Sequence, residues 1–329
     1  MKLSDFDYSL PKELIAQYPL QERESARLLV LNRGKGTIQH AVFKDILKYL
    51  LEGDLLVLND TKVLPCRLFG KRATGGRVEI FLLSNKQGRS FNAMISPGRV
   101  KIGEKIIFNG GKISAQVLGK NEVVFNTDDD SAVYGLGVMP LPPYIKRPAE
   151  PADNINYQTV YASKEGAVAS PTAGLHFSER LIEKLKASGI DFAKITLHVG
   201  LGTFKPVKAE DVTDHKMEPE YFEVPKEAVD KIESSRKEKK RIIAVGTTSL
   251  RALESYAVGA SKGFTDLFIY PGYKFKITDG LLTNFHLPKT TLFMLACAFA
   301  GERLAKKAYA EAIAEKYRFY SYGDAMLII

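Results

Sequence analysis

Residues 78–125, VEIFLLSNKQGRSFNAMISPGRVKIGEKIIFNGGKISAQVLGKNEVVF, decide half of the fold. Turn-forming sequences such as Pro97-Gly98 and Asn109-Gly110-Gly111 interrupt this stretch, and no helical periodicity appears in it. Many short strands at close spacing predict a small antiparallel β-barrel. The expected strands are Val78–Leu83, Phe91–Ile95, Lys105–Phe108, Ile113–Leu118 and Val123–Phe125.

The segments on either side of the barrel have a different pattern. Met139–Pro148 is rich in proline, which blocks both helices and central strands, so we expect a stiff return linker there. An apolar strand at 55–58 comes before the barrel, and helices and strands alternate after the linker. This alternation predicts an α/β domain. The sequence therefore predicts a mixed α/β main domain, residues 1–61 and 150–329, with an inserted small antiparallel β-barrel domain at residues 62–149.

Individual elements of the α/β domain follow from local patterns. We expect a helix at 43–51, a helix capped by Ser178, and a helix at 226–240 with a charged outer face. Strands are expected at 27–31, 192–199, 241–245, 264–270 and 325–329, and further helices at 249–256, 290–300 and 302–316.

Charge points to a polyanionic partner. The 329 residues carry a formal net charge of +9, and residues 60–112 hold eleven Lys or Arg against three acids. Basic side chains near phosphates release condensed counterions, which favours binding of nucleic acid. The alternative is that barrel strands expose Lys and Arg on their outer face with no partner. The candidate nucleic-acid contacts are Arg72, Arg77, Arg99, Lys146 and Arg147.

Several classes of protein are disfavoured. Cys66 and Cys297 form no Cys-x-x-Cys pair, so neither a structural zinc site nor a disulfide framework is expected. The spacing of the histidines also matches no metal site, so we expect no metal. Met1–Leu10 does not resemble a signal peptide, and the longest apolar stretch, Leu292–Ala300, is too short to span a bilayer. A cytoplasmic enzyme that does not bind membranes is expected.

Three strand ends run into polar turns, and open α/β sheets bind ligands at the carboxyl ends of their strands. The first turn, Ile195–Phe204, contains His198, Gly200, Gly202 and Thr203, whose glycines allow close approach to the backbone; a plain tight turn is the alternative. The second, Val245–Glu254, starts a helix at Thr247, Thr248 and Ser249, which suits a carboxylate or phosphate. Its alternatives are ordinary N-capping and a surface pair between Arg251 and Glu254.

The third polar turn and one additional segment also carry candidate polar groups. Thr283–Thr291 contains Asn284 and His286 before a helix, although Pro288 also fits a capped helix entry. Ser170–Phe177 contains Thr172 and His176 among small residues. We expect this loop to leave the His176 imidazole accessible for acid or base catalysis, with a structural hydrogen-bonding role as the alternative.

The chain combines several unusual strings in one order. They are Phe6–Gln17, Arg23–Leu29, Asn59–Val63, Leu141–Ile145, Pro171–Phe177, His198–Phe204, Gly246–Glu254, Asn284–Thr291 and Ser321–Met326. Over essentially the whole chain, this set resembles the S-adenosylmethionine:tRNA ribosyltransferase-isomerase family, known as QueA. One position departs from the family pattern, since Ala26 stands where a serine is expected before the arginine.

The resemblance implies an activity. The family transfers the ribosyl part of S-adenosylmethionine to 7-aminomethyl-7-deazaguanine at the wobble position of tRNA and rearranges it to an epoxy-cyclopentane. Adenine and methionine leave, and epoxyqueuosine-tRNA is the product. S-adenosylmethionine is consumed as a co-substrate, with neither a true cofactor nor a metal. The resemblance also implies a barrel joined to an α/β domain. The expected partner is the anticodon region of tRNA, and the expected state is a monomer.

This chemistry requires a base for the carbon beside the sulfonium, an acid for the leaving adenine, and a cation or helix N-terminus for the methionine carboxylate. The candidates for proton transfer are His176, His198, Glu254 and Asp324. Arg251 and the Thr247–Ser249 turn are the candidates for the carboxylate. The full set of expected substrate-binding residues is Thr172, Gly200, Gly202, Thr203, Thr247, Thr248, Ser249, Arg251, Asn284 and His286.

Two other functions fit the same sequence. An S-adenosylmethionine-dependent RNA methyltransferase is the first alternative, and analysis of the donor product separates it from ribosyl transfer. A non-catalytic RNA-binding protein that uses the basic barrel is the second. The clustered polar loops at strand ends count against this second alternative.

Overall fold

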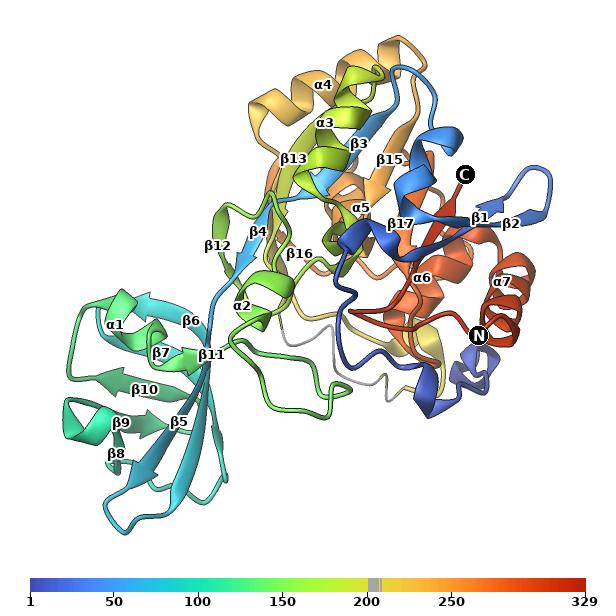
Figure 1. The fold of residues 1–329 in the computed structure, drawn as a ribbon. Helices are drawn as coiled ribbons and strands as arrows, with labels where there is room; N and C mark the ends of the chain where they lie inside the picture. The colour runs from blue at the N-terminus through green and yellow to red at the C-terminus, as the bar shows by residue number, and fades with distance from the viewer. Residues whose placement is uncertain (201–206, 208) are drawn as a thin grey trace.

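The computed structural model describes residues 1–200, 207 and 209–329. These residues form a nine-stranded sheet with helices on both faces, a separate barrel, and a small two-stranded sheet between them (Figure 1). The nine-stranded sheet has the order β16-β14-β13-β3-β15-β17-β18-β1-β2. Its strands are β1 Arg27–Asn32, β2 Thr37–Val42, β3 Leu55–Asn59, β13 Asp191–Leu197, β14 Glu220–Glu223, β15 Ile242–Val245, β16 Lys262–Thr265, β17 Gly280–Asn284 and β18 Ala325–Ile328.

Four central strands of this sheet run parallel. β13 pairs with β3, β3 with β15, and β15 with β17, all in the same direction. β14, β16 and β2 extend the two sides of the sheet in antiparallel pairs. The carboxyl ends of β13, β3, β15 and β17 therefore meet at one edge, where a ligand site is expected.

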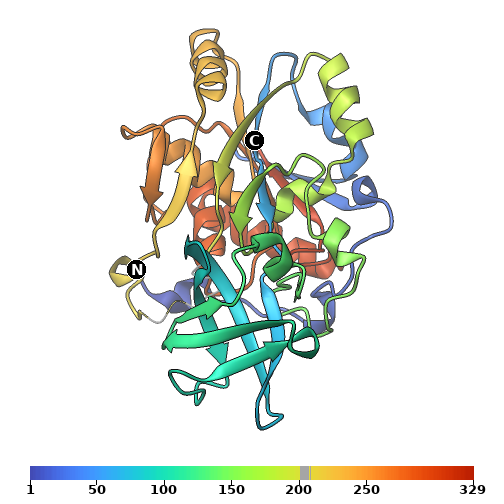
Figure 2. The ribbon, with the colours of Figure 1, turned by 90° about the vertical axis from the view of Figure 1, so that its left-hand side faces the viewer.

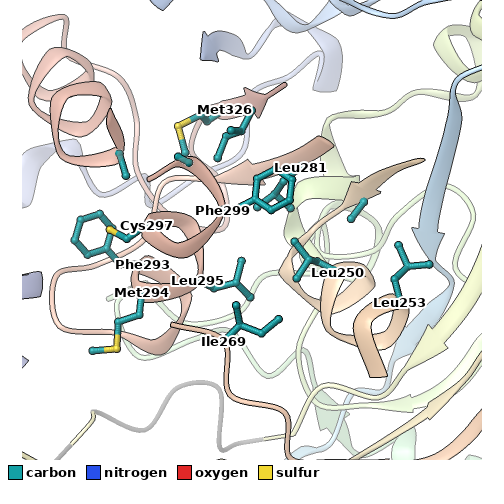
Figure 3. Packing of buried hydrophobic residues seen from close by; sticks show 14 of the residues in the cluster. Leu250, Leu253, Ile269, Leu281, Phe293, Met294, Leu295, Cys297, Phe299 and Met326 are labelled. Atoms are coloured by element: carbon teal, nitrogen blue, oxygen red, sulfur yellow. The ribbon is translucent and has the colours of Figure 1, made fainter. Parts of the chain in front are cut away.

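Alternation along the strands builds two cores. In β3, Leu55 and Val57 belong to the core on one face of the sheet, while Leu56 and Leu58 belong to the core on the other face. Figure 3 shows the first of these cores, where Leu295 of α6 faces Leu250 of α5, and Phe293 lies on the other side of α6. A sheet covered on both faces explains why its central strands are apolar throughout. The helices here are α3 Glu179–Ala187, α4 Lys226–Lys237, α5 Thr247–Tyr256, α6 Thr291–Ala300 and α7 Glu302–Ala314.

Most predicted elements of this part are present, with shifts at their ends. Ser178 caps α3 by accepting from the Leu181 N–H, and Thr290 caps α6 in the same way. The helix expected at 43–51 is a 3₁₀-helix at Phe43–Tyr49. The strand expected at 264–270 ends at Thr265. The other 3₁₀-helices are Leu3–Phe6, Lys12–Leu14, Arg23–Ser25, Asn109–Gly111, Thr172–His176 and Val212–Asp214.

The second sheet closes into the predicted barrel. Its order is β11-β5-β6-β7-β10-β9-β8, and an additional β5–β8 pairing joins its ends into a six-stranded antiparallel barrel. β5 was not predicted. A Cβ at Gly70 in this strand would lie 2.6–2.7 Å from Ile106 and Phe108, so glycine allows β5 to close against β8. The strands are β5 Arg67–Arg72, β6 Arg77–Gln87, β7 Ser90–Ser96, β8 Lys105–Phe108, β9 Ile113–Gly119, β10 Glu122–Phe125 and β11 Gly137–Val138.

The proline-rich segment connects the barrel to the main body. Met139, Leu141 and Ile145 are buried in a small core with Tyr157 and Tyr322. Beside it, β4 (Thr61–Val63) pairs with β12 (Lys164–Ala167), and both lie between the barrel and the large sheet (Figures 1 and 2). The short helix α1 (Asp130–Tyr134) packs on the barrel core, and α2 (Asp153–Asn156) follows the proline-rich segment. The mixed α/β fold with a β-barrel is confirmed, and the residue boundaries of the two domains stay predictions.

Candidate active site at the carboxyl ends of the parallel strands

A cavity that is partly open to solvent lies at the carboxyl edge of the parallel strands. The turn between β15 and α5 and the end of β17 form one side, and the segment 169–173 forms another. Its lining residues are Tyr144, Tyr157, Ala169, Ser170, Pro171, Thr172, Ala173, Val199, Gly246, Thr247, Thr248, Thr283, Asn284, His286, Leu292, Tyr320 and Ser321. This is the place where the topology predicts a ligand.

Five of the predicted substrate-binding residues line this cavity. They are Thr172, Thr247, Thr248, Asn284 and His286. Asn284 joins two of the walls, because its Oδ1 accepts from Thr172 Oγ1 at 3.3 Å and its Nδ2 donates to the Tyr320 carbonyl at 3.1 Å. Separate segments of the chain are thereby fixed around one space.

The end of β3 supports the cavity from behind. Asn59 is fully buried, and its Nδ2 donates to the Leu197 carbonyl at 2.9 Å and to Thr248 Oγ1 at 3.1 Å. Its Oδ1 accepts from the N–H groups of Leu197 and Thr61, at 3.0 and 3.2 Å. One side chain thus ties the ends of β3 and β13 to the start of α5.

Two buried polar atoms on the wall have no hydrogen-bond partner among the described residues. They are the Tyr157 hydroxyl, on a side chain with 0% exposure, and Ser170 Oγ, on a residue with 6% exposure. A buried polar atom without a partner costs roughly 1–3 kcal/mol. Such atoms on a cavity wall are explained by a polar ligand that completes their hydrogen bonds.

Aromatic side chains form one wall of the cavity. The Tyr144 and Tyr320 rings lie 3.8 Å apart between centroids, and the Tyr144 hydroxyl pairs with Ser321 Oγ at 2.5 Å. Burial raises the pKa of Tyr144, Tyr157 and Tyr320 above the ordinary phenol value. These phenols are therefore neutral hydrogen-bonding groups at physiological pH.

Two histidines at the site are buried rather than accessible. His176 is 4% exposed, packs against the Phe43 ring, and pairs through Nε2 with Asn284 Nδ2 at 3.2 Å. The expectation of an accessible imidazole is therefore wrong, because the 3₁₀-helix Thr172–His176 turns the ring inward. His286 pairs with Thr283 Oγ1 at 2.8 Å. Burial lowers the pKa of both histidines to about 3, so both rings are neutral at physiological pH.

Like His176, the other proton-transfer candidates do not line the cavity. His198 Nδ1 pairs with Thr61 Oγ1 at 2.8 Å and its ring stacks on Tyr221, while burial lowers its pKa. Glu254 is fully buried and accepts hydrogen bonds from Tyr273, Lys276, Ile277 and Thr278.

Asp324 is likewise enclosed by the fold. It accepts from the N–H groups of Arg27 and Arg318, at 2.9 and 2.7 Å, and desolvation raises its pKa. Its position suits a structural role at the start of β18 rather than contact with a ligand in the cavity.

Arg251 is engaged elsewhere. Its Nη1 forms a buried ion pair with Glu220, and its Nε donates to the Leu267 carbonyl at 3.0 Å. The surface pair expected between Arg251 and Glu254 is wrong, because both face the interior of the α5 packing and have other partners. Arg251 does not line this cavity, but it lines a small neighbouring pocket together with Thr247 and Thr248.

The remaining substrate-binding candidates contribute differently. Ser249 Oγ donates to the Val245 carbonyl at 2.8 Å, and the Gly200 N–H donates to Glu220 Oε1 at 2.8 Å. Neither residue lines the cavity. Gly202 and Thr203 lie outside the described residues.

The basic candidates fall into two groups. Arg77, Arg99 and Lys146 are exposed. Arg72 forms an ion pair with Glu104, and Arg147 forms a two-pronged pair with Asp153 at 2.7 and 2.8 Å. The side chains of this second group are fixed by the fold, whereas the first group is available to phosphates.

Sequence reasoning missed Tyr144, Tyr157, Ser170 and Tyr320 on the walls, and Asn59 behind them. Tyr144 and Asn59 lie in strings that carried the family resemblance, and that was their only signal. Among the described residues, no group of three or more His, Cys, Asp or Glu side chains is placed to hold a metal ion. No helix in the part of the chain that the structure describes is long and apolar enough to cross a membrane.

Comparison with known proteins gives full-length matches. Residues 3–328 match the family model described as queuosine biosynthesis protein. Proteins named S-adenosylmethionine:tRNA ribosyltransferase-isomerase are 53% identical in Sulfurihydrogenibium sp. (strain YO3AOP1) and 49% identical in Aquifex aeolicus, each with 100% of both chains covered. The solved S-adenosylmethionine tRNA ribosyltransferase of Thermotoga maritima is 38% identical, with 99% of this chain and 100% of that chain covered and a TM-score of 0.59. The chain therefore belongs to the queuosine biosynthesis family of S-adenosylmethionine:tRNA ribosyltransferase-isomerases.

Proposed function

We propose that this enzyme transfers the ribosyl part of S-adenosylmethionine to 7-aminomethyl-7-deazaguanine at the wobble position of tRNA, and isomerises it to give epoxyqueuosine-tRNA. Adenine and methionine are released. The observation that carries the proposal is full-length identity of about 50% to relatives named for this activity, in a chain whose parallel strands end at a cavity.

The cavity suits S-adenosylmethionine as a substrate. The unpartnered Tyr157 hydroxyl and Ser170 Oγ provide hydrogen bonds for a polar ligand. The aromatic wall of Tyr144, Tyr157 and Tyr320 provides π faces that attract a cation such as the sulfonium. The donor is used up in the reaction, so these residues hold a substrate and not a resident cofactor.

The reaction moves protons beside the donor. The sulfonium makes the adjacent ribosyl carbon acidic, so a base removes its proton, and an acid assists the departure of adenine. Asn284 on the cavity wall donates through Nδ2 to His176 Nε2 at 3.2 Å, so the neutral ring is in direct contact with a residue that lines the cavity. Of the four residues predicted for proton transfer, we favour His176 on this contact.

The base that accepts the ribosyl group is part of tRNA, which is a polyanion. We propose that the anticodon region of tRNA approaches between the cavity and the barrel. The exposed Arg77 and Arg99 of the barrel and Lys146 of the proline-rich segment contact its phosphates. The segment that carries Lys146 also carries Tyr144 of the cavity wall, which places phosphate contacts and donor contacts on one short stretch.

Donor products distinguish ribosyl transfer from methyl transfer. With radiolabelled S-adenosylmethionine and tRNA bearing the aminomethyl base, chromatography should find one adenine and one methionine per modified tRNA. tRNA with guanine at the wobble position should give nothing, because it lacks the attacking amine. S-adenosylhomocysteine as the donor product, or methyl label on the tRNA, would identify a methyltransferase instead.

A further inference from the structure

The helix that follows β15 begins with unused hydrogen-bond donors. α5 starts at Thr247, and Gly246 before it supplies no side-chain cap. The first bond into the helix is from the Leu250 N–H to the Gly246 carbonyl at 3.1 Å. The N–H groups of Thr247, Thr248 and Ser249 therefore have no acceptor within the helix. Thr247 and Thr248 also line the cavity, so these donors lie beside it.

The orientation of the Asn59 amide is fixed by the backbone. Its Oδ1 takes two N–H groups, those of Leu197 and Thr61, so this atom must be the oxygen. Its Nδ2 must then face the Leu197 carbonyl and Thr248 Oγ1, at 2.9 and 3.1 Å. The Thr248 hydroxyl is consequently an acceptor in its contact with Asn59.

This contact decides what the Thr248 hydroxyl does on its other side. A hydroxyl has one proton to donate, and Asn59 occupies a lone pair and not that proton. No acceptor for this proton is found among the described residues, and Thr248 lines the cavity. The hydroxyl proton is therefore left for a ligand, next to the N–H groups at the start of α5.

We propose that the N-terminus of α5 and the Thr248 hydroxyl form the binding site for a carboxylate, the one on the methionine end of S-adenosylmethionine, and that Asn59 is the residue that positions Thr248 as a donor. Helix N-terminal N–H groups and an oriented hydroxyl suit an anion, and the helix dipole adds to their attraction. The unpartnered, buried Ser170 Oγ and Tyr157 hydroxyl on the same cavity point independently to a polar ligand. Arg251 does not line the cavity, and its guanidinium is already paired with Glu220, so the site that we propose does not depend on it.

This inference rests on the proposed function and deepens it. The test compares two ligands by calorimetry: S-adenosylmethionine, which carries the carboxylate, and 5′-methylthioadenosine, which lacks the amino-acid end. Thr248→Val keeps the shape and removes the hydroxyl. It should weaken S-adenosylmethionine about 10- to 100-fold, the range for a hydrogen bond to a charged group, and leave methylthioadenosine unchanged. Thr248→Ser keeps the hydroxyl and should bind S-adenosylmethionine as the unaltered protein does.

The role of Asn59 is tested by Asn59→Asp, whose second oxygen accepts where Nδ2 donated. The Thr248 hydroxyl should then turn its proton to the new carboxylate, and S-adenosylmethionine binding should fall by a similar factor. In the Thr248→Val background, Asn59→Asp should cause a smaller further loss than it causes alone, because the hydroxyl through which it acts is gone and only the repulsion between the two carboxylates remains.

Each failure has its own meaning. Equal weakening of both ligands by Thr248→Val would place the carboxylate elsewhere, and additive effects of the two substitutions would remove Asn59 from the site. If donor binding follows the expected pattern but the product is S-adenosylhomocysteine, the carboxylate site stands and the proposed reaction falls.

Discussion

At the scale of residues, His176 and His286 show how burial sets chemistry. Each ring is almost fully enclosed and has a neutral partner, Asn284 Nδ2 for one and Thr283 Oγ1 for the other. Without a carboxylate to compensate, desolvation disfavours the imidazolium, and the pKa of each falls to about 3. Both rings therefore stay neutral hydrogen-bonding groups through the physiological range.

A pH titration tests this directly. The chain has five histidines, so their imidazole signals can be followed by NMR and assigned by single His→Asn variants. The signals of His176 and His286 should not shift between pH 8 and roughly 4.5. An inflection near the ordinary pKa of 6.5 in either signal would contradict the burial argument.

The lowered pKa values of His176 and His286 also determine how the stability of the folded protein changes with pH. Below pH 6.5 the unfolded chain binds protons at these two rings and the folded chain does not, so stability falls as the pH drops toward 3. Above pH 6.5 both states are neutral and this loss is absent. The slope from each ring is at most about 1.4 kcal/mol per pH unit.

At the scale of elements, the turn from β15 to α5 depends on a single glycine. Gly246 has φ 93°, a left-handed conformation that L side chains rarely adopt. It ends the strand and releases the first N–H groups of α5 toward the cavity, which it also lines. The local geometry of one residue thus exposes a set of N–H hydrogen-bond donors at the edge of the cavity.

Gly246→Ala should strain this turn and weaken the binding of S-adenosylmethionine. Gly272→Ala is a matched control, since Gly272 has φ 104°, its added Cβ would meet no atom within 4 Å, and it is not on the cavity wall. Both variants should lose stability by about 1–2 kcal/mol in thermal unfolding. Calorimetry should show weaker S-adenosylmethionine binding for Gly246→Ala alone; equal affinity in the two variants would make the turn a structural feature only.

At the scale of the whole molecule, the proline-rich segment that connects the barrel to the α/β body contributes to the cavity. The proline-rich segment leaves the barrel after β11, buries Met139 and Leu141 in a small core, and presents Tyr144 to the cavity. The Tyr144 ring contacts the ring of Tyr320, which lies 176 residues further along the chain.

The charge on the barrel predicts salt-dependent tRNA binding. Arg77→Glu with Arg99→Glu should weaken binding and flatten the plot of log affinity against log salt, by about 0.7–0.9 for each phosphate that the protein no longer neutralises. Arg72 is unsuitable for this test, because its pair with Glu104 would be broken as well. Lys184→Glu with Lys237→Glu, exposed on α3 and α4, changes the net charge equally and should leave the slope nearly unchanged. An unchanged slope in the barrel variant would place the tRNA surface elsewhere.

The sequence by itself determined the elements and their class. Short strands between turn signals indicated the barrel, and alternating helices and strands indicated the α/β body, because backbone preference and the period of apolar residues are local properties. The polar start of α5 and the end of β17 were visible for the same reason. Both belong to the cavity.

Only the tertiary structure decided which polar groups are free to act. Arg251 looked like a cation for a ligand, but Glu220, 31 residues away, neutralises it in the interior. His176 lay in a loop of small residues, yet Phe43 covers its ring. Asn59 and Thr248, 189 residues apart, form one hydrogen bond behind the cavity. Burial and pairing depend on residues that are distant along the chain, so local sequence cannot specify them.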